Sequence, residues 1–384
     1  MYNPGANPVS ELLGGAVESL DIPEELFRAA ATEYADVGSW LAEHADGCEG
    51  WEVYPQGSFL LGTVVRPLGR DEYDVDLVCR RSLDKSQVTQ EELKQGVKKA
   101  LSGYLEARRG DSGAPDSCEE GRRCLTLIYE KAFHLDVLPA IPDSNCLPTG
   151  ILLTDRDLRA WQFSDPKAYA KWFKAQMVAE FTAKRAVLAE AARVEPEQIP
   201  DSRVKTTLQR TVQALKHHRN LYFADNLEDR PASILLTTLA ARAYTGQQDL
   251  FDALLGATAG MPNFIEREGN SWSVPNPVQP QENFADKWSA HPERAEHFYD
   301  WLGQLEIDLR AAGETRDLGR VASRLVEGFG EDPIKRAAER LGDSARKTRE
   351  SGKLGFDRTA GALAVASPGV TQVKRHGFYG TQGE

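Results

Sequence analysis

The chain lacks long apolar segments. No apolar run among its 384 residues approaches the roughly 20 residues that cross a bilayer. The N-terminus also lacks the basic segment and apolar core of a secretory leader. We therefore expect neither a membrane span nor export, and we expect the protein to act in the cytoplasm.

An excess of positive charge is also missing, since the formal net charge is −12 at pH 7. A surface with this excess of negative charge repels a long nucleic acid, so we expect no long DNA or RNA partner. A local basic pocket is still compatible with the negative net charge. Hydrophobic residues make up 41% of the chain and charged residues 27%, which is typical of an ordinary folded protein. A chain of this length can bury a large core, and we expect two lobes.

Cysteine is scarce: the chain has five cysteines, an odd number, with no C-x-x-C pair. A disulfide framework is therefore not expected. One set of residues could in principle collect around zinc, but its spacing fits no common pattern: Cys118, Cys124, His134 and Cys146. We interpret these cysteines as buried or incidental thiols. A Walker A motif is also absent, which excludes a P-loop as the means of holding phosphates.

The chain does contain a Gly57-Ser58 turn followed by a predicted strand with Asp74 and Asp76 two residues apart. Side chains alternate along a strand, so both carboxylates share one face and Val75 lies on the other. Mg²⁺ binds such hard oxygens together with substrate phosphates. The turn can hold phosphate through its unhindered backbone N–H groups and the serine hydroxyl. The alternative interpretation is an exposed strand with an incidental D-x-D.

A third carboxylate, Asp136, lies in another predicted strand. Phe133, Leu135 and Val137 alternate with it, so Asp136 lies on the face opposite these apolar residues. If the two strands pair, three carboxylates converge, in the geometry that holds two metal ions about 3.5–4 Å apart. Together with the Gly-Ser turn, this set indicates nucleotidyl transfer.

These residues resemble a known family. The Gly57-Ser58 turn, the Asp74 and Asp76 pair and the distant Asp136 resemble the polymerase-beta-like nucleotidyltransferases. Residues 56–79 and 276–288 narrow the resemblance to the bacterial cyclic-oligonucleotide synthases of CBASS anti-phage defence, relatives of cyclic GMP-AMP synthase and oligoadenylate synthase.

The resemblance implies a bilobed α+β fold, with a polymerase-beta-like mixed sheet and helices joined to a helical C-terminal lobe. It also implies an enzyme that condenses nucleoside triphosphates, ATP or GTP among them, into a cyclic di- or trinucleotide and releases pyrophosphate. The expected cofactor is Mg²⁺, as two ions held by the three aspartates, with Mn²⁺ as a substitute. Accessory CBASS regulatory proteins are the expected partners.

The resemblance also implies roles for two residues of the helical lobe. Lys216 would reach the triphosphate from a helix predicted over residues 204–222, and Ser233 would contact it from the start of the next helix. Gln56, Gly57 and Ser58 would bind the nucleotide from the other side. From the pattern alone, Lys216 and its neighbour Arg219 could equally be solvated charges, and Ser233 an ordinary first-turn residue.

We expect the catalytic lobe, with an N-terminal bracing helix, over residues 1–160. The helical lobe is expected over 161–345 and a flexible tail over 346–384. Within these lobes we predict one long helix over 167–193, a last helical stretch over 318–341, and a strand that Pro139 and Pro142 end. A proline-rich segment, 273–280, should form an extended strap, with a structural role or with Asn283 or Asp286 touching the acceptor nucleotide.

Several alternatives stay open at this point. The enzyme could add nucleotides to another acceptor, such as an RNA end, a small molecule or a protein. It could make linear oligoadenylate, or it could be a scaffold that only binds nucleotide or a partner. The C-terminal residues 379–384 could be conjugated by an accessory ligase, as in some of the systems that this chain resembles; the absence of conjugates on co-expression with such a ligase would argue against it.

Overall fold

The computed structural model of this chain describes residues 7–45, 50–66, 68, 73–129, 133–157, 160–351, 354–357, 362–365 and 371–372. Residues 379–384, for which tail conjugation was one of the open hypotheses, lie outside these ranges. No helix in the described ranges is long and apolar enough to cross a membrane.

A mixed sheet forms the first lobe. Its strand order is β1-β2-β5-β4-β3, and β6 pairs with the far end of β5 and with β7. The central pair, β2 and β5, is parallel, and its register places Asp76 directly opposite Asp136. The strands are β1 (Trp51–Gln56), β2 (Tyr73–Arg81), β3 (Ser117–Glu120), β4 (Leu125–Tyr129), β5 (Phe133–Pro142), β6 (Ile151–Leu153) and β7 (Gln162–Ser164).

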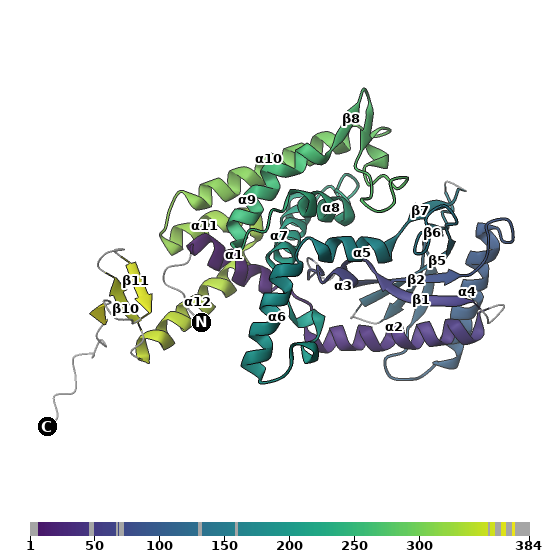
Figure 1. Cartoon of the computed structure of the whole chain (residues 1–384), viewed down its shortest axis with the longest axis horizontal. Coiled ribbons are helices and arrows are strands. Elements are labelled where there is room, and N and C mark those ends of the chain that lie inside the picture. The colour runs from purple at the N-terminus through teal and green to yellow at the C-terminus, as the bar shows by residue number, and fades with distance from the viewer. Residues whose placement is uncertain are drawn as a thin grey trace.

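Two helices, α2 (Glu24–His44) and α4 (Gln90–Ala107), cover the apolar face of this sheet (Figure 1). Helix α4 begins with a capping box, in which Thr89 accepts from the Glu92 amide and the Glu92 side chain accepts from the Thr89 amide. The alternation that we predicted for β2 is present, because its apolar residues enter this core while its carboxylates lie on the other face. The sheet therefore leaves its acidic face open to the second lobe.

Helices form the second lobe, in which α7 is the central element and is buried along most of its length. The sharply amphipathic α11 and the preceding α10 pack beside α7. The helices are α5 (Pro166–Ala175), α6 (Val178–Ala192), α7 (Thr207–Tyr222), α8 (Ser233–Ala243), α9 (Leu250–Gly260), α10 (Glu293–Gly313), α11 (Leu318–Phe329) and α12 (Glu331–Glu350). A small hairpin of β8 (Glu266–Glu268) and β9 (Ser271–Ser273) precedes the proline-rich strap, residues 273–280. The strap is not helical, as predicted, but it is not extended throughout, because Pro275 pairs with Asn283 and the residues between them form a loop.

The first helix, α1 (Pro8–Glu18), packs away from the sheet although it lies within the predicted first lobe. Leu12, Leu13 and Val17 are fully buried in the same core as α7, and α1 contacts α9, α11 and α12 (Figure 1). The chain therefore enters the helical lobe first, and then crosses to the sheet lobe through α2.

Three of the predicted boundaries were wrong. The helix expected over 167–193 is two helices, α5 and α6, separated at Gln176 and Met177. The stretch expected over 318–341 is divided at Gly330, whose φ of 81° no helical residue adopts. Strand β5 continues through Pro139, which pairs with Cys79 while its carbonyl accepts from the Thr154 amide, and ends only at Pro142.

The region predicted as a tail also contains regular structure. Helix α12 continues past residue 345 to Glu350. Beyond it, β10 (Leu354–Asp357) pairs antiparallel with both β11 (Ala362–Val365) and β12 (Thr371–Gln372). The strands formed although the sequence of this region has little periodicity.

Candidate active site

The three predicted carboxylates come from the two central strands and line one cavity of about 650 Å³. Asp74 and Asp76 lie on β2, and Asp136 lies opposite Asp76 on β5. Asp74 is exposed at the mouth of the cavity, whereas Asp76 and Asp136 are half-buried. The two strands that carry the aspartates therefore pair, which is what the sequence analysis required for the three carboxylates to converge.

The cavity holds the carboxyl group of Asp76 in an unfavourable environment. Burial, together with the neighbouring charges of Asp136 and Asp74, raises the pKa of Asp76 to about 7. The Asp136 carboxylate is held by a hydrogen bond of 2.5 Å from the Thr126 hydroxyl on β4. A carboxyl group with this pKa and two acidic neighbours favours the arrival of a cation.

The donor set fits a divalent metal ion, because crowded carboxylate oxygens are the ligands that Mg²⁺ prefers. In the described ranges, no three histidine, cysteine, aspartate or glutamate side chains already form a metal-binding cluster. The three aspartates therefore share a cavity without forming such a cluster. One or two carboxylates are sufficient to hold Mg²⁺ when substrate phosphates complete its ligands.

The Gly57-Ser58 turn is the first turn of a short helix, α3 (Gly57–Leu61), directly after β1. Gly57 has a φ of 66°, and a Cβ at this position would collide with the Asp76 carboxylate. Gly57 and Ser58 both line the cavity. Gln56 pairs with Asp76 across the β1–β2 ladder, but it lines an adjoining hollow instead of the main cavity.

The opposite wall of the cavity comes from the helical lobe and is basic. Lys216 on α7 is 3% exposed, and its Nζ donates to the Thr63 carbonyl and hydroxyl, both at 3.1 Å. Burial, together with nearby Arg219, lowers the pKa of Lys216 to about 7. Ser233 is the first residue of α8 and lines the same cavity. The alternative of a solvated Lys216 is therefore wrong.

Arg219 is a cavity residue that we had noted only as a neighbour of Lys216. It is 5% exposed, and burial lowers the pKa of its guanidinium to about 9. Its hydrogen-bond partners among the residues that the structure describes are neutral: the Pro231 carbonyl at 2.7 Å, the Ser233 hydroxyl at 3.1 Å and the Asn220 side chain. A buried guanidinium held by neutral groups is suited to binding an anion. The signal in the sequence was its position, one helical turn after Lys216.

An acidic sheet wall and a basic helical wall thus face each other across one cavity, with a Gly-Ser turn at its edge. This arrangement is the one that the resemblance to the polymerase-beta-like nucleotidyltransferases led us to expect. Residues 18–176, which span α2, the sheet and α5, match the domain described as Second Messenger Oligonucleotide or Dinucleotide Synthetase.

Two relatives extend the match over nearly the whole chain. A c-di-GMP synthase of Roseivirga ehrenbergii is 30% identical over 97% of each chain. The cyclic dinucleotide synthase CdnG of Bradyrhizobium diazoefficiens is 24% identical over 96% of this chain and 91% of its own.

Solved structures agree with the fold. CdnG in complex with GTP superposes with a TM-score of 0.67 at 22% identity, covering 87% of this chain and 99% of that one. A complex of CdnC with HORMA-deltaN from E. coli MS115-1 superposes with a TM-score of 0.60 at 14% identity, covering 83% and 96%.

The chain belongs to this family of second messenger oligonucleotide or dinucleotide synthetases, the CD-NTases of CBASS. It is a nucleotidyltransferase that condenses nucleoside triphosphates into a cyclic oligonucleotide second messenger for anti-phage defence and releases pyrophosphate. Enzymes of this family use divalent metal ions and a two-metal mechanism.

Proposed function

We propose that the enzyme joins two molecules of GTP into cyclic di-GMP and releases two molecules of pyrophosphate. The observation that carries this choice of base is the 30% identity, over 97% of both chains, to a protein named c-di-GMP synthase. The structural likeness to CdnG, which was solved with GTP, supports it. The cavity of about 650 Å³ is in the size range of a small-ligand site.

Asp74, Asp76 and Asp136 would hold two Mg²⁺ ions, with Mn²⁺ as a substitute. When bound, the ions neutralise the triphosphate and lower the pKa of the acceptor hydroxyl. Asp136 is the proposed general base, because it lies beside Asp76 and its other partner, Thr126, is a neutral hydroxyl. The acceptor oxygen attacks the α-phosphorus, the bond to the β-phosphate breaks, and Asp136 takes the hydroxyl proton.

The donor triphosphate would lie between the two lobes. Gly57 and Ser58 would contact it through backbone N–H groups and the serine hydroxyl, with Gln56 next to them. Lys216 and Ser233 would contact it from the helical side. A phosphate near Lys216 would favour the charged ammonium and reverse the lowering of its pKa by burial.

We also propose how the chain divides. Residues 1–160, without α1, would act as the catalytic lobe, and residues 161–345 with α1 would close over the nucleotides. We propose that the enzyme works in the cytoplasm, where its substrates are, and that an accessory regulator binds it, as HORMA-deltaN binds CdnC. No long nucleic acid is part of this proposal, in keeping with a net charge of −12.

The test is an incubation of the purified protein with all four labelled nucleoside triphosphates and Mg²⁺ or Mn²⁺. Phosphatase treatment, chromatography and mass measurement follow. We expect a phosphatase-resistant product with the mass of cyclic di-GMP, formed from GTP alone. A resistant product that contains another base would overturn the choice of GTP, and a phosphatase-sensitive ladder would show linear transfer instead.

A further inference from the structure

The cavity does not end at the aspartates. Arg219, Ser233 and Ile234 also line a second hollow of about 540 Å³, which we name the Arg123 hollow. Its further lining includes Arg123, Phe163, Glu282, Phe284 and Trp288. A smaller hollow is lined by Gly57, which also lines the cavity, and by Glu282, which also lines the Arg123 hollow. A dinucleotide synthase must hold two nucleotides, and these adjoining hollows offer room for a second base beside the triphosphate site.

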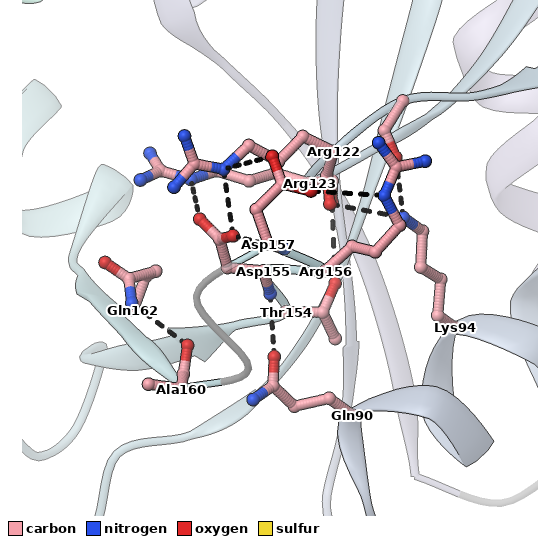
Figure 2. Close-up of polar contacts among 11 residues, drawn as sticks. Gln90, Lys94, Arg122, Arg123, Thr154, Asp155, Arg156, Asp157, Ala160 and Gln162 are labelled. Carbon is pink, nitrogen blue, oxygen red and sulfur yellow. Dashed lines mark hydrogen bonds and ion pairs between the residues drawn. The ribbon is translucent and has the colours of Figure 1, made fainter.

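The position of Arg123 in this hollow is fixed by a buried carboxylate. Asp155, whose side chain is fully buried, accepts from Nε of Arg122 and from Nε of Arg123, both at 2.9 Å. Figure 2 shows both guanidinium groups extending past Asp155 in the same direction, away from Lys94 and Arg156. Because Asp155 binds through Nε, the terminal N–H groups of Arg123 remain available for a bidentate contact.

Whereas Arg123 offers hydrogen-bond donors to this hollow, Glu282 offers acceptors. Its carboxylate accepts from the Asn276 side chain at 2.7 Å and from the Ser164 hydroxyl at 3.3 Å. It forms no ion pair among the residues that the structure describes. A carboxylate has about four acceptor positions, so about two remain for a ligand. Burial raises the pKa of Glu282 to about 7, and a ligand that donates hydrogen bonds would stabilise its charged form.

This combination of groups matches guanine. Guanine presents two N–H donors, N1 and N2, on one edge and two acceptors, O6 and N7, on the next, whereas adenine has no donor at N1 or C2. Phe163 and Phe284 in the lining are only partly buried, so their rings are suited to the flat apolar face of a base. We propose that the Arg123 hollow binds the guanine of one GTP, with Glu282 accepting from N1 and N2 and Arg123 donating to O6 and N7. This inference rests on the proposed use of GTP.

The test uses two analogues that each remove one contact. ITP lacks the 2-amino group that Glu282 would read, and 7-deaza-GTP lacks the N7 acceptor that Arg123 would read. The readout is the ratio of kcat/KM for GTP to that for each analogue, measured by pyrophosphate release. We expect wild type to prefer GTP by about tenfold or more over each, since a hydrogen bond to a charged group contributes about 1.5–3 kcal/mol.

Each variant should erase one preference and leave the other. Glu282→Gln should lower the GTP-to-ITP ratio about tenfold with the 7-deaza ratio unchanged, and Arg123→Gln should do the reverse. The matched control is Glu228→Gln. Glu228 also lines this hollow, but its side chain is 82% exposed, so this variant removes a carboxylate that is largely in solvent. It should change neither ratio.

A purely structural role for Glu282 would lower activity with all three nucleotides equally, so unchanged ratios in both variants would overturn the inference while leaving the proposed function intact. Because Glu282 also holds the strap through Asn276, Glu282→Gln is checked by its melting temperature. If that variant does not fold, the Arg123→Gln ratio decides alone. A wild-type enzyme that does not use GTP would overturn the proposed function and this inference together.

Discussion

The two walls of the active-site cavity obtain their charges in different ways. The sheet lobe places Asp76 opposite Asp136 through backbone pairing, on strands whose other face packs in the buried core of the lobe. The helical lobe places Lys216 and Arg219 by burial on α7, where their partners are carbonyls, hydroxyls and an amide. The acidic wall brings carboxylates of like charge together, and the basic wall buries cations away from solvent.

Each wall carries an excess of one charge, and the ligands would supply the opposite charge: metal cations for the aspartates, and phosphates for Lys216 and Arg219. The acidic wall raises the pKa of Asp76, and the basic wall lowers the pKa values of Lys216 and Arg219. Both shifts oppose the charged form, so both walls reduce the stability of the ligand-free protein at neutral pH. Cations on one side and phosphates on the other would relieve this cost on binding. The site is thus prepared for an ion–triphosphate complex.

The largest effect should come from removing the acidic wall. Asp74→Asn or Asp76→Asn should lower kcat by about 10³-fold, because loss of one group that stabilises charge in the transition state can cost that much. Product formation with labelled GTP measures it. Retained activity in either variant, with an unchanged fold by circular dichroism, would remove these aspartates from the mechanism.

Next in size is a change to the turn that faces the acidic wall. Gly57→Ala should lower activity by about 100-fold, because its Cβ would displace the Asp76 carboxylate and a misplaced catalytic group can cost that much. Gly269→Ala is the matched control: Gly269 also has a positive φ, 60°, but no atom lies near its Cβ position. Equal effects of the two variants on kcat would mean that backbone strain, and not contact with Asp76, is responsible.

The basic wall should respond through binding. Lys216→Met should raise KM for GTP by about 10- to 100-fold, because a buried charge-assisted contact to phosphate contributes about 1.5–3 kcal/mol. We expect Lys216→Met to lower kcat less than Asp74→Asn or Asp76→Asn does. Steady-state kinetics separates the two parameters, and a change in kcat alone would place Lys216 outside the triphosphate site.

The two walls should also respond to pH with opposite signs. The pKa of Asp76 rises on folding from its ordinary value of about 4 to about 7, so its destabilising effect develops over this pH range and is complete above it. The gain in melting temperature of Asp76→Asn over wild type should therefore grow from about pH 4 to about pH 7 and stay constant above it. The pKa of Lys216 falls on folding, so its penalty is complete below about pH 7 and fades as pH rises toward 10. Lys216→Met should therefore gain most at the lower pH. Parallel pH dependences would contradict the contrast between the walls.

The smallest effect should be that of Ser233→Ala, which removes one neutral hydroxyl from the basic wall. We expect KM for GTP to rise about two- to tenfold, in line with about 0.5–1.5 kcal/mol for a neutral hydrogen bond. Thr237→Ser, one turn later on α8 and also at the cavity, is a control that keeps its hydroxyl. A larger effect than that of Lys216→Met would mean that Ser233 acts mainly by holding Arg219.

Local sequence patterns were sufficient to predict the two strands that carry the acidic wall. The period-two alternation around Asp74 and Asp136 predicted both strands, because one of their faces is a buried core and the other is polar. Element boundaries were harder. Nothing in residues 167–193 signals the break between α5 and α6, and Pro139 stays within β5 because its place in the ladder can be filled without its N–H.

The sequence by itself determined the chemistry at hand: three carboxylates, a Gly-Ser turn and a lysine on a predicted helix. Tertiary structure alone decided which of these groups meet and in what state. Burial converted Lys216 and Arg219 from apparent surface charges into the basic wall, and the strand pairing set Asp76 against Asp136. Glu282 and Arg123, 159 positions apart in the numbering, meet in one hollow only because the strap returns to the sheet. Periodicity reports which face of an element is buried, but contacts between distant elements depend on how the whole chain packs.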